Sequence, residues 1–197
     1  MTEIVVATRN QGKLREFRAV LGPENFKILS LDDIAFSGEI AEDGADYLEN
    51  ARKKSRSVAK ACGKIVLADD SGIEIDALDG KPGVHSARFG GADLDSTARN
   101  EIVLKLLQSV QHPKRTARFR CVLSISLPDG RKYNCEGICE GHIAIRPKGK
   151  NGFGYDPIFL AAETGKTMAE LGPEEKNRIS HRAMALRKAV QECLMFF

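Results

Sequence analysis

Residues 65–76 read IVLADDSGIEID, and the interpretation of this stretch decides the fold class. Ile65 to Ala68 form a short apolar run, as in a buried strand. Two adjacent aspartates, a serine and a glycine follow, and the pattern from Ile73 to Leu78 is compatible with a continuation of the strand. Asp and Ser side chains often bond their own backbone in turns. Taken alone, the stretch predicts a strand that ends in a turn at the two aspartates.

The segments on either side predict further strands and helices. Asp46 and Glu49 form a capping box at the start of one helix, and Gly63 suits its end. An earlier helix is ended by Gly22-Pro23. Apolar periodicity indicates strands at residues 3–7 and 26–31, and helices at residues 14–21, 46–62, 96–110 and 179–194.

The clearest β pattern covers residues 117–127, where apolar and polar side chains alternate. Pro128-Asp129-Gly130 turns this strand into a partner at residues 131–146, so the two strands should be antiparallel. Early strand–helix units followed by a long hairpin predict an α/β fold with a mixed sheet. We expect a single domain over residues 1–197, because no repeat, low-complexity stretch or linker interrupts the chain.

Composition and charge exclude several classes of protein. Of the 197 residues, 42% are hydrophobic and 29% are charged, which suits one sizeable core. The net charge of +3 is too small to indicate a nucleic-acid binder. No apolar run approaches the roughly 20 residues that cross a bilayer, and the N-terminus lacks the features of a signal peptide. We therefore expect a cytoplasmic protein with no membrane and no nucleic-acid partner.

The five cysteines include no C-x-x-C pair, so disulfides are not expected. Cys135, Cys139 and His142 have the residue types of a zinc site. However, their segment alternates like a strand, which places the two cysteines on one face and His142 on the other. Buried, reduced thiols are the better interpretation.

The loop between the first strand and its helix suits a phosphate. A helix N-terminus offers free N–H groups, and a hydroxyl, an amide, a glycine and a lysine lie beside it. A Walker A loop would need Gly at Ala7 and Ser or Thr at Leu14, so the loop is not of that type. The alternative is a polar connection without a ligand. The candidate residues are Thr8, Arg9, Asn10, Gln11, Gly12 and Lys13.

Asp69 and Asp70 are candidates for binding a metal ion, and the acidic segment of residues 39–44 is a candidate for a further carboxylate ligand. Carboxylates suit Mg²⁺, which bridges to substrate phosphates with few protein ligands. A carboxylate beside such an ion can also deprotonate a water. Adjacent strand residues point to different sides, so Asp69 and Asp70 need not share a role. The alternatives are the turn for the aspartates and, for the segment of residues 39–44, acids that lie near a helix start and favour its dipole.

The loop of residues 151–157, NGFGYDP, suits a nucleotide base. Its glycines free the backbone for close approach, and Phe153 and Tyr155 can stack on a base. Asp156 can accept hydrogen bonds. The alternative is a connecting loop with its aromatic side chains in the core.

Basic residues near the final helix suit a carbonyl or phosphate oxygen, because Arg and Lys donate hydrogen bonds and never accept them. Lys176, His181 and Arg182 are the candidates. If the helix begins near Ser180 rather than Pro173, Ser180 is its N-cap; otherwise the basic residues form a solvated face. The other basic clusters, residues 52–56 and 113–120, are interpreted as solvated faces.

Together, these motifs closely resemble the inosine/xanthosine triphosphate pyrophosphatase family in their set and order. Its members hydrolyse non-standard purine nucleoside triphosphates, and the resemblance spans essentially the whole chain. The motifs that carry it are Thr8-x-Asn10-x-x-Lys13, Glu42-Asp43-Gly44, Glu49-Asn50-Ala51, Ala68-Asp69-Asp70-Ser71-Gly72, Pro82-Gly83-x-x-Ser86-Ala87-Arg88-Phe89, Gly152-Phe153-Gly154-Tyr155-Asp156-Pro157 and Glu175-Lys176-x-x-Ile179-Ser180-His181-Arg182.

The resemblance implies an elongated mixed sheet with flanking helices, two lobes around a central cleft, and a homodimer. It implies that a nucleoside triphosphate and water give the monophosphate and pyrophosphate, with Mg²⁺ as cofactor. The preferred bases are hypoxanthine and xanthine, as in ITP, dITP and XTP.

The resemblance also implies roles for the matching residues. Glu42 and Asp70 bind the metal, and Asp70 accepts the proton of the attacking water. Ser71 contacts the substrate. The triphosphate is held by Thr8, Asn10, Gly12 and Lys13, with Arg9 and Gln11 in the same loop, and the base is held by Phe153, Gly154, Tyr155, Asp156, Lys176, His181 and Arg182.

Two other functions stay open. A related family of nucleotide pyrophosphatases, linked to septum inhibition, shares the fold and acts on pyrimidine or modified nucleotides. The basic clusters and the aromatic loop also suit a nucleotide- or RNA-binding module without turnover.

Overall fold

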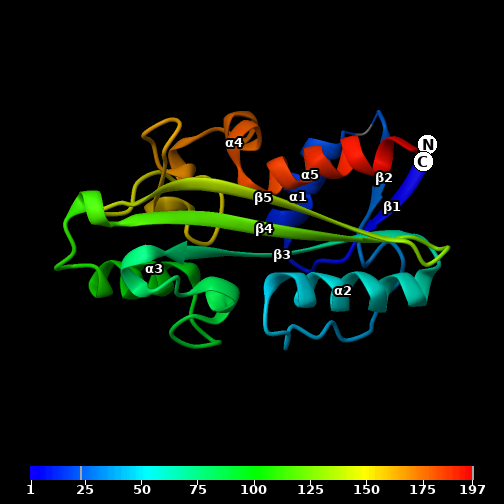
Figure 1. Ribbon diagram of the computed structural model, residues 1–197, viewed down its shortest axis with the longest axis horizontal. Coiled ribbons are helices and arrows are strands. Elements are labelled where there is room, and N and C mark those ends of the chain that lie inside the picture. Colours follow the sequence, from blue (N-terminus) through cyan, green and yellow to red (C-terminus); the bar gives the residue numbers. More distant parts are fainter. Residues whose placement is uncertain (23, 197) are drawn as a thin grey trace. The chain divides into compact units, whose positions relative to one another are not determined.

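The computed structural model describes residues 1–22 and 24–196 and is an α/β fold built on a six-stranded sheet (Figure 1). The strands are β1 (Thr2–Val6), β2 (Phe26–Leu29), β3 (Ile65–Ile75), β4 (Thr116–Ser126), β5 (Lys132–Ile143) and β6 (Phe159–Ala161). The α-helices are α1 (Gln11–Leu21), α2 (Tyr47–Cys62), α3 (Ser96–Leu106), α4 (Pro173–Ile179) and α5 (His181–Glu192). Short 3₁₀ turns cover Asp76–Leu78, Gly83–Arg88, His112–Lys114, Asp156–Ile158, Met168–Glu170 and Leu194–Phe196.

The sheet is mixed, as the strand–helix units and the hairpin predicted. Its strand order is β2-β1-β3-β4-β5-β6. β1 is parallel to both of its neighbours, with Ile4 opposite Ile28 in β2 and opposite Ile65 in β3. β6 is antiparallel to β5, with Leu160 opposite His142. Parallel strands at one edge and antiparallel strands at the other confirm the predicted class.

The expected turn at the two aspartates is wrong, because β3 continues through them as one strand of 11 residues. Residues 65–70 are all buried. β3 lies between β1 and β4, so its backbone groups find partners in the sheet and need none from Asp or Ser side chains. The charges of Asp69 and Asp70 are met by cations from other segments, which a local reading of the sequence does not contain.

The ends of α1 and α2 follow the predicted caps. Asp46 precedes α2, and its Oδ1 accepts from the N–H of Glu49 at 2.7 Å. The Glu49 carboxylate accepts from the N–H of Ala45 at 2.8 Å, one residue earlier than in a standard capping box. Gly63 ends α2 with a φ of 63°, which glycine adopts without strain. Gly22 follows α1, whereas its expected partner Pro23 lies outside the described residues.

Helix α3 ends at Leu106 and does not reach the predicted residue 110. The buried Arg115 guanidinium donates to the carbonyls of Leu107, Val110 and Ala144, at 2.6, 2.9 and 3.0 Å. The carbonyls of Leu107 and Val110, which follow the end of α3, thereby gain a side-chain donor.

The C-terminal part is two helices and not one. α4 begins with Pro173, and Ser180 has extended angles (φ −69°, ψ 146°) between α4 and α5. Both starting points considered for the final helix therefore exist. α5 places His181 and Arg182 in its first turn.

β5 alternates as expected. Cys135 and Cys139 are buried, whereas His142 is half-buried and stacks on His112 with ring centroids 5.6 Å apart. The described cysteines are all reduced. No helix in the described part of the chain combines the length and apolar character needed to cross a bilayer.

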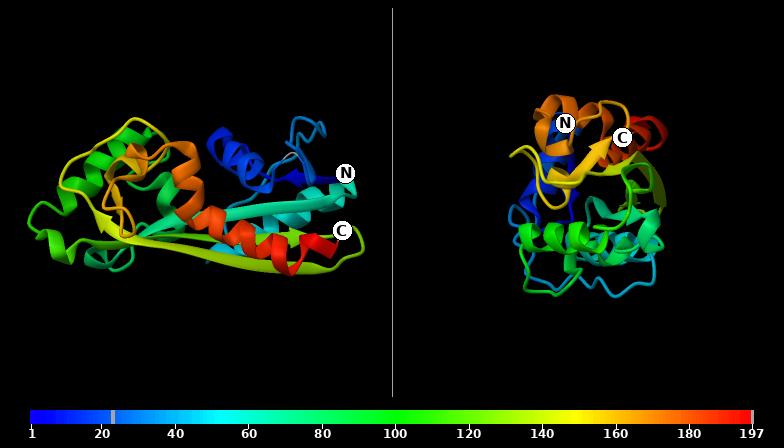
Figure 2. Two further views of the ribbon diagram at one scale, coloured as in Figure 1. Left: turned by 90° about the horizontal axis from the view of Figure 1, so that it is seen from above. Right: turned by 90° about the vertical axis from the view of Figure 1, so that its left-hand side faces the viewer.

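The chain forms two compact units. Unit 1 comprises Met1–Asp70, Cys121–Gly137 and Arg182–Phe197, and unit 2 comprises Ser71–Arg120 and Ile138–His181. In unit 1, α1 and α5 cover one face of the strands and α2 covers the other (Figures 1 and 2). Unit 2 has its own core, which joins residues of β3, α3, β4, β5 and α4. The candidate site residues are divided between these two units.

Candidate functional site

The predicted phosphate loop joins β1 to the N-terminus of α1. Asn10 is the N-cap of this helix, and its Oδ1 accepts from the N–H of Lys13 at 3.1 Å. Thr8 Oγ1 accepts from the N–H of Asn10 at 3.2 Å, and Arg9 donates to the Gly38 carbonyl at 3.1 Å. The loop thus has a fixed conformation at the positive end of a helix, as an anion site requires. The remaining predicted members are Gln11, which is exposed, and Gly12, which is buried.

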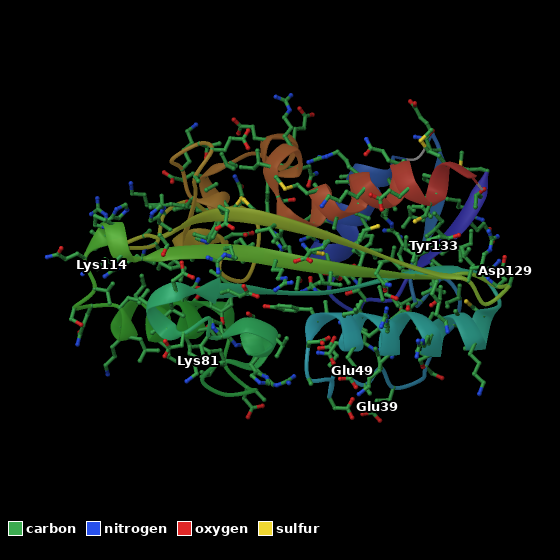
Figure 3. The ribbon with its side chains drawn as sticks, in the orientation of Figure 1. Glu39, Glu49, Lys81, Lys114, Asp129 and Tyr133 are labelled. Carbon is green, nitrogen blue, oxygen red and sulfur yellow. The ribbon has the colours of Figure 1, made fainter. Side chains whose placement is uncertain are left out.

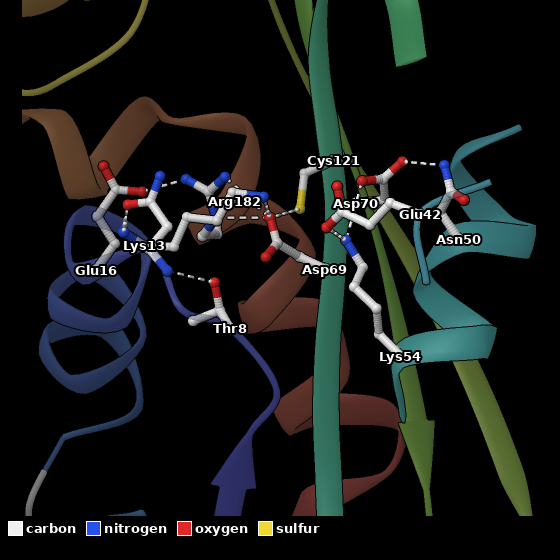
Figure 4. A network of polar contacts seen from close by, with 11 residues as sticks. Thr8, Lys13, Glu16, Glu42, Asn50, Lys54, Asp69, Asp70, Cys121 and Arg182 are labelled. Carbon is white, nitrogen blue, oxygen red and sulfur yellow. Dashed lines mark hydrogen bonds and ion pairs between the residues drawn. The ribbon is translucent and has the colours of Figure 1, made fainter. Parts of the chain in front are cut away.

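Asp69 lies on the α1 and α5 side of β3, where it joins a buried ionic network (Figure 4). Its Oδ2 accepts from Lys13 Nζ at 3.0 Å and from Arg182 Nε and Nη2 at 3.1 and 2.9 Å. Arg182 also donates to Glu16. Burial alone would raise the pKa of Asp69, but Lys13, Arg182 and Lys54 hold it well below its usual value. Asp69 is therefore ionised and anchors two cations.

The network around Asp69 is balanced, because it pairs the cations Lys13 and Arg182 with the anions Asp69 and Glu16. Arg182 was predicted to contact a base. The structure places its guanidinium in unit 1, 1% exposed and bonded to two carboxylates. Lys13, in contrast, keeps 16% of its side chain exposed and remains accessible to an anion.

Asp70 points to the opposite side of β3, toward α2 (Figure 4). Its Oδ1 lies 3.0 Å from Lys54 Nζ, which also contacts Glu42 Oε1 at 2.9 Å. Its Oδ2 accepts from Asn50 Nδ2 at 3.1 Å. Burial raises the pKa of Asp70, and Lys54 and Lys13 offset only part of this effect. The pKa of Glu42 is lowered, because Lys54 outweighs the opposing effect of burial.

The carboxylates of Glu42 and Asp70 contact the same ammonium, that of Lys54. Lys13 also acts electrostatically on both carboxylates. Two carboxylate donors held by one side chain suit Mg²⁺, which takes oxygen ligands and few of them from the protein. The predicted pair of metal ligands is therefore brought together. Glu39, from the same acidic segment, is exposed and extends outward (Figure 3).

Lys54 was missed by the sequence analysis, which interpreted residues 52–56 as a solvated face. That interpretation is wrong for Lys54, which is 3% exposed. A usable signal was its place in the helix, since Lys54 lies seven residues after Tyr47 and four before Val58, both on the packed stripe. The residue type concealed it, because lysines are rarely buried.

In unit 2, Asp156 organises a second cluster. Its Oδ2 accepts from the N–H of Phe153 at 2.8 Å and from Lys176 Nζ at 2.5 Å. Lys176 Nζ lies 4.7 Å from the centre of the Phe153 ring, as in a cation–π contact. A Cβ at Gly152 would lie 1.9 Å from Asp156 Oδ2, so this close approach requires glycine. Phe153, Asp156 and Lys176 therefore form one assembly, and its role as a base pocket stays a prediction.

The other predicted residues of unit 2 support this loop or pack beside it. Tyr155 belongs to the core, and its hydroxyl donates to the Ser86 carbonyl at 2.8 Å. Its burial raises the pKa of Tyr155 to about 12. The carbonyl of Gly154 accepts from Asn100 Nδ2 at 3.1 Å. His181 stacks on Phe119 with ring centroids 4.8 Å apart, and Ser71 is half-buried in β3. Of the two loop aromatics, Phe153 is the more exposed, so core packing explains Tyr155 better than base stacking does.

The predicted site residues thus form two groups, each within one unit. Asp70 and Ser71 are consecutive in β3 and belong to different units, as do His181 and Arg182 at the start of α5. Unit 1 holds Thr8, Arg9, Asn10, Gln11, Gly12, Lys13, Glu42, Asp70 and Arg182, and unit 2 holds Ser71, Phe153, Gly154, Tyr155, Asp156, Lys176 and His181.

Comparison with known proteins gives one consistent result. The family model of the Ham1 family matches residues 4–192. A Bacillus subtilis protein named dITP/XTP pyrophosphatase is 50% identical over 188 residues, which cover 95% of each chain. A Geobacter sulfurreducens protein of the same name is 50% identical over 186 residues, or 94% of each chain.

Solved structures agree with these sequence matches. A HAM1 protein from Coxiella burnetii is 40% identical and superimposes with a TM-score of 0.87, covering 99% of this chain and 100% of its own. The Staphylococcus aureus Ham1 protein is 39% identical, with a TM-score of 0.86 and 99% of both chains covered. The family model and the solved structures therefore indicate the same family.

Proposed function

The chain belongs to the Ham1 family, and from this premise we propose that it is a nucleoside triphosphate pyrophosphatase. Its substrates are the non-standard purine nucleotides dITP, ITP and XTP, in agreement with the names of its relatives. Water attacks the α-phosphorus, the bond from that phosphorus to the bridging oxygen breaks, and the products are the monophosphate and pyrophosphate. The enzyme thereby removes these nucleotides from the nucleotide pool.

The observation that carries this proposal is the charge arrangement on the two sides of β3. On one side, Lys13 lies beside a phosphate-type loop and is held by Asp69. On the other, the carboxylates of Asp70 and Glu42 contact the same Lys54 ammonium and are thereby brought together. Hydrolysis at phosphorus depends on positioning and charge neutralisation more than on covalent chemistry.

Asp70 accepts the proton of the attacking water in this proposal. A carboxylate is a better general base when its pKa is above the ordinary value, and burial raises the pKa of Asp70. Asp70 and Glu42 hold Mg²⁺, which supplies positive charge at the reacting phosphate when bound. Lys13 and the N–H groups that begin α1 bind the triphosphate.

Base recognition is assigned to the Phe153, Asp156 and Lys176 assembly. Phe153 offers an aromatic face, and the Lys176 ammonium donates to the 6-oxo group of hypoxanthine or xanthine. Adenine carries an amino donor at that position, so donor would face donor and a buried group would stay unpaired. We further propose a homodimer that works in the cytoplasm.

A pyrophosphate-release panel tests the function. With Mg²⁺, we expect rapid release from ITP, dITP and XTP, slow release from ATP and dTTP, and loss of release when Mg²⁺ is chelated. Asp70→Asn should keep its circular dichroism spectrum and lose about 10²–10⁴-fold in kcat, because a general base contributes about that much.

Two results of the panel would replace the proposal. Rapid hydrolysis of dTTP or UTP with inert ITP would favour the family linked to septum inhibition. Tight binding of ITP and XTP with no pyrophosphate release would favour a nucleotide-binding module.

A further inference from the structure

Asn50 is a buried polar residue on α2 that the proposed chemistry does not use. It is 1% exposed, and both ends of its carboxamide are bonded. Nδ2 donates to Asp70 Oδ2 at 3.1 Å, and Oδ1 accepts from the N–H of Gly44 at 2.7 Å. If the carboxamide were rotated by half a turn, its oxygen would face the Asp70 carboxylate oxygen and its NH₂ group would face the N–H of Gly44. Acceptor would then meet acceptor, and donor would meet donor. The two partners therefore fix the orientation of the side chain.

These partners lie in the two segments that carry the acidic pair. Asp70 belongs to β3, and Gly44 lies two residues after Glu42 in the loop before α2. The loop approaches Asn50 closely, since a Cβ at Gly44 would lie 2.6 Å from Asn50 Oδ1 and 3.0 Å from its backbone nitrogen. The Asn50 carboxamide is thus a neutral link between the Asp70 strand and the Glu42 loop.

Lys54 joins the same two segments in a different way. It contacts Glu42 Oε1 and Asp70 Oδ1 with a positive charge, so it competes with any cation for these oxygens. Asn50 contacts Asp70 through Oδ2 and carries no charge, so it does not compete for Oδ1 and is compatible with a cation that replaces Lys54 there. Partners that hold metal-binding carboxylates in this way typically change metal affinity about 10–100-fold when removed.

We propose that Asn50 is a positioning residue that sets the spacing and orientation of the Glu42 and Asp70 carboxylates for a divalent cation. The inference rests on the proposed function, in which these carboxylates hold the metal. Asn50 itself touches neither substrate nor metal. It acts through Asp70 on one side and through the backbone of the Glu42 loop on the other.

Titration of the full-length protein with Mn²⁺ in the absence of nucleotide, followed by electron paramagnetic resonance, tests the inference directly. Asn50→Ala should weaken Mn²⁺ binding by about 10–100-fold. At saturating Mg²⁺ and ITP, we expect its kcat to fall and its KM for ITP to change little, because the phosphate loop is untouched. Wild-type Mn²⁺ affinity in a folded Asn50→Ala variant would overturn the inference.

Ser55→Ala is the matched control. Ser55 is also buried on α2, and its hydroxyl bonds Ser124 and Ser126 at 3.0 Å, without contact to Glu42 or Asp70. This variant should be less stable and should bind Mn²⁺ within about twofold of wild type. Equal weakening of Mn²⁺ binding in both variants would show a general packing effect and reject the role of Asn50.

Gly44→Ala provides a second route if Asn50→Ala does not fold. Its added methyl group would lie 2.6 Å from Asn50 Oδ1, and 3.0 Å from the Asn50 nitrogen and from Glu49 Cβ, so the carboxamide must shift and Mn²⁺ binding should weaken again. Where Asn50→Ala does fold, the two changes combined should have a less than additive effect, because the displaced group is then absent. Unchanged Mn²⁺ affinity in Gly44→Ala would also contradict the inference.

The outcomes separate this inference from the proposed function. A wild-type protein that releases pyrophosphate from ITP and binds no Mn²⁺ without nucleotide rejects the inference and keeps the function. A protein that binds Mn²⁺ in an Asn50-dependent manner and hydrolyses no triphosphate rejects the function.

Discussion

Arg182 shows how a charge is accommodated in the interior of unit 1. It is 1% exposed, and its guanidinium bonds Asp69 of β3 and Glu16 of α1. A buried charge is tolerated when it is paired and hydrogen-bonded, and Arg182 meets both conditions. Its first role is therefore to join three segments that are distant in the sequence, whether or not it also contacts a base.

Arg182→Ala should lower the free energy of unfolding by about 3–5 kcal/mol, because it leaves Asp69 and Glu16 buried without their common cation. Urea denaturation followed by circular dichroism measures this change. Lys188→Ala is the control on the same helix, since Lys188 is exposed and donates only to the Glu136 carbonyl in the contacts described. An Arg182→Ala variant as stable as wild type would mean that the network contributes little.

At the scale of secondary-structure elements, α2 carries two residues that contact Asp70. Asn50 and Lys54 lie one turn apart on its buried stripe, so the position of the helix along its axis sets both contacts. Its start is fixed by the Asp46 cap and by the bond between Glu49 and the N–H of Ala45. The cap therefore affects the candidate site indirectly.

Asp46→Ala should lower the free energy of unfolding by about 1 kcal/mol, because the N–H of Glu49 loses its acceptor. Asp46→Asn should retain most of the stability, since an Asn side chain accepts the same bond. Urea denaturation of the two variants beside wild type measures the difference. Equal losses in both variants would assign the effect to charge and not to capping.

The elements were largely predictable from local patterns, and the exceptions have a common cause. The period-2 pattern of β4 and the caps of α2 depend on neighbouring residues, so the sequence predicts both. The turn expected at Asp69 and Asp70 does not form, because distant cations pair with the two carboxylates inside a continuous strand. These cations are Lys13, Lys54 and Arg182. These contacts span up to 113 residues, beyond the reach of any local pattern.

The candidate site residues that belong to a sequence motif could be predicted. The residues that reach the site only because the fold buries them beside it could not. The phosphate loop and the Glu42 and Asp70 pair came from motifs. Lys54 and Asn50 were not assigned any role, because only the fold places them beside Asp70. The role of Asp69 was open in the sequence, and the structure shows it as the anchor of Lys13 and Arg182.

At the scale of the whole molecule, buried thiols occur in both units and link stability to alkaline pH. Burial raises the pKa of Cys139 to about 12, and burial together with Cys193 and Glu192 raises the pKa of Cys135 to about 12, from the ordinary thiol value of 9.0. Between pH 9 and 12 the unfolded chain releases protons that the folded chain keeps. The stabilisation is therefore full below pH 9 and is lost as the pH rises toward 12.

Urea denaturation with reductant present should show a lower free energy of unfolding at pH 10 than at pH 8, by about 1 kcal/mol for each such thiol. The double variant Cys135→Ala, Cys139→Ala should lose part of this pH dependence, whatever its stability at pH 8. An identical pH dependence in the double variant and in wild type would assign the alkaline effect to other groups.

The division of the chain has a consequence for its synthesis on the ribosome. The chain passes between the two units after residues 70, 120, 137 and 181, so neither unit is a continuous segment. A nascent chain that has emerged only as far as His181 contains every residue of unit 2, whereas unit 1 still lacks α5. Until Arg182 emerges, Asp69 and Glu16 have no guanidinium to bind. The residues from Arg182 onward therefore complete the interior of unit 1 only after every residue of unit 2 has been made.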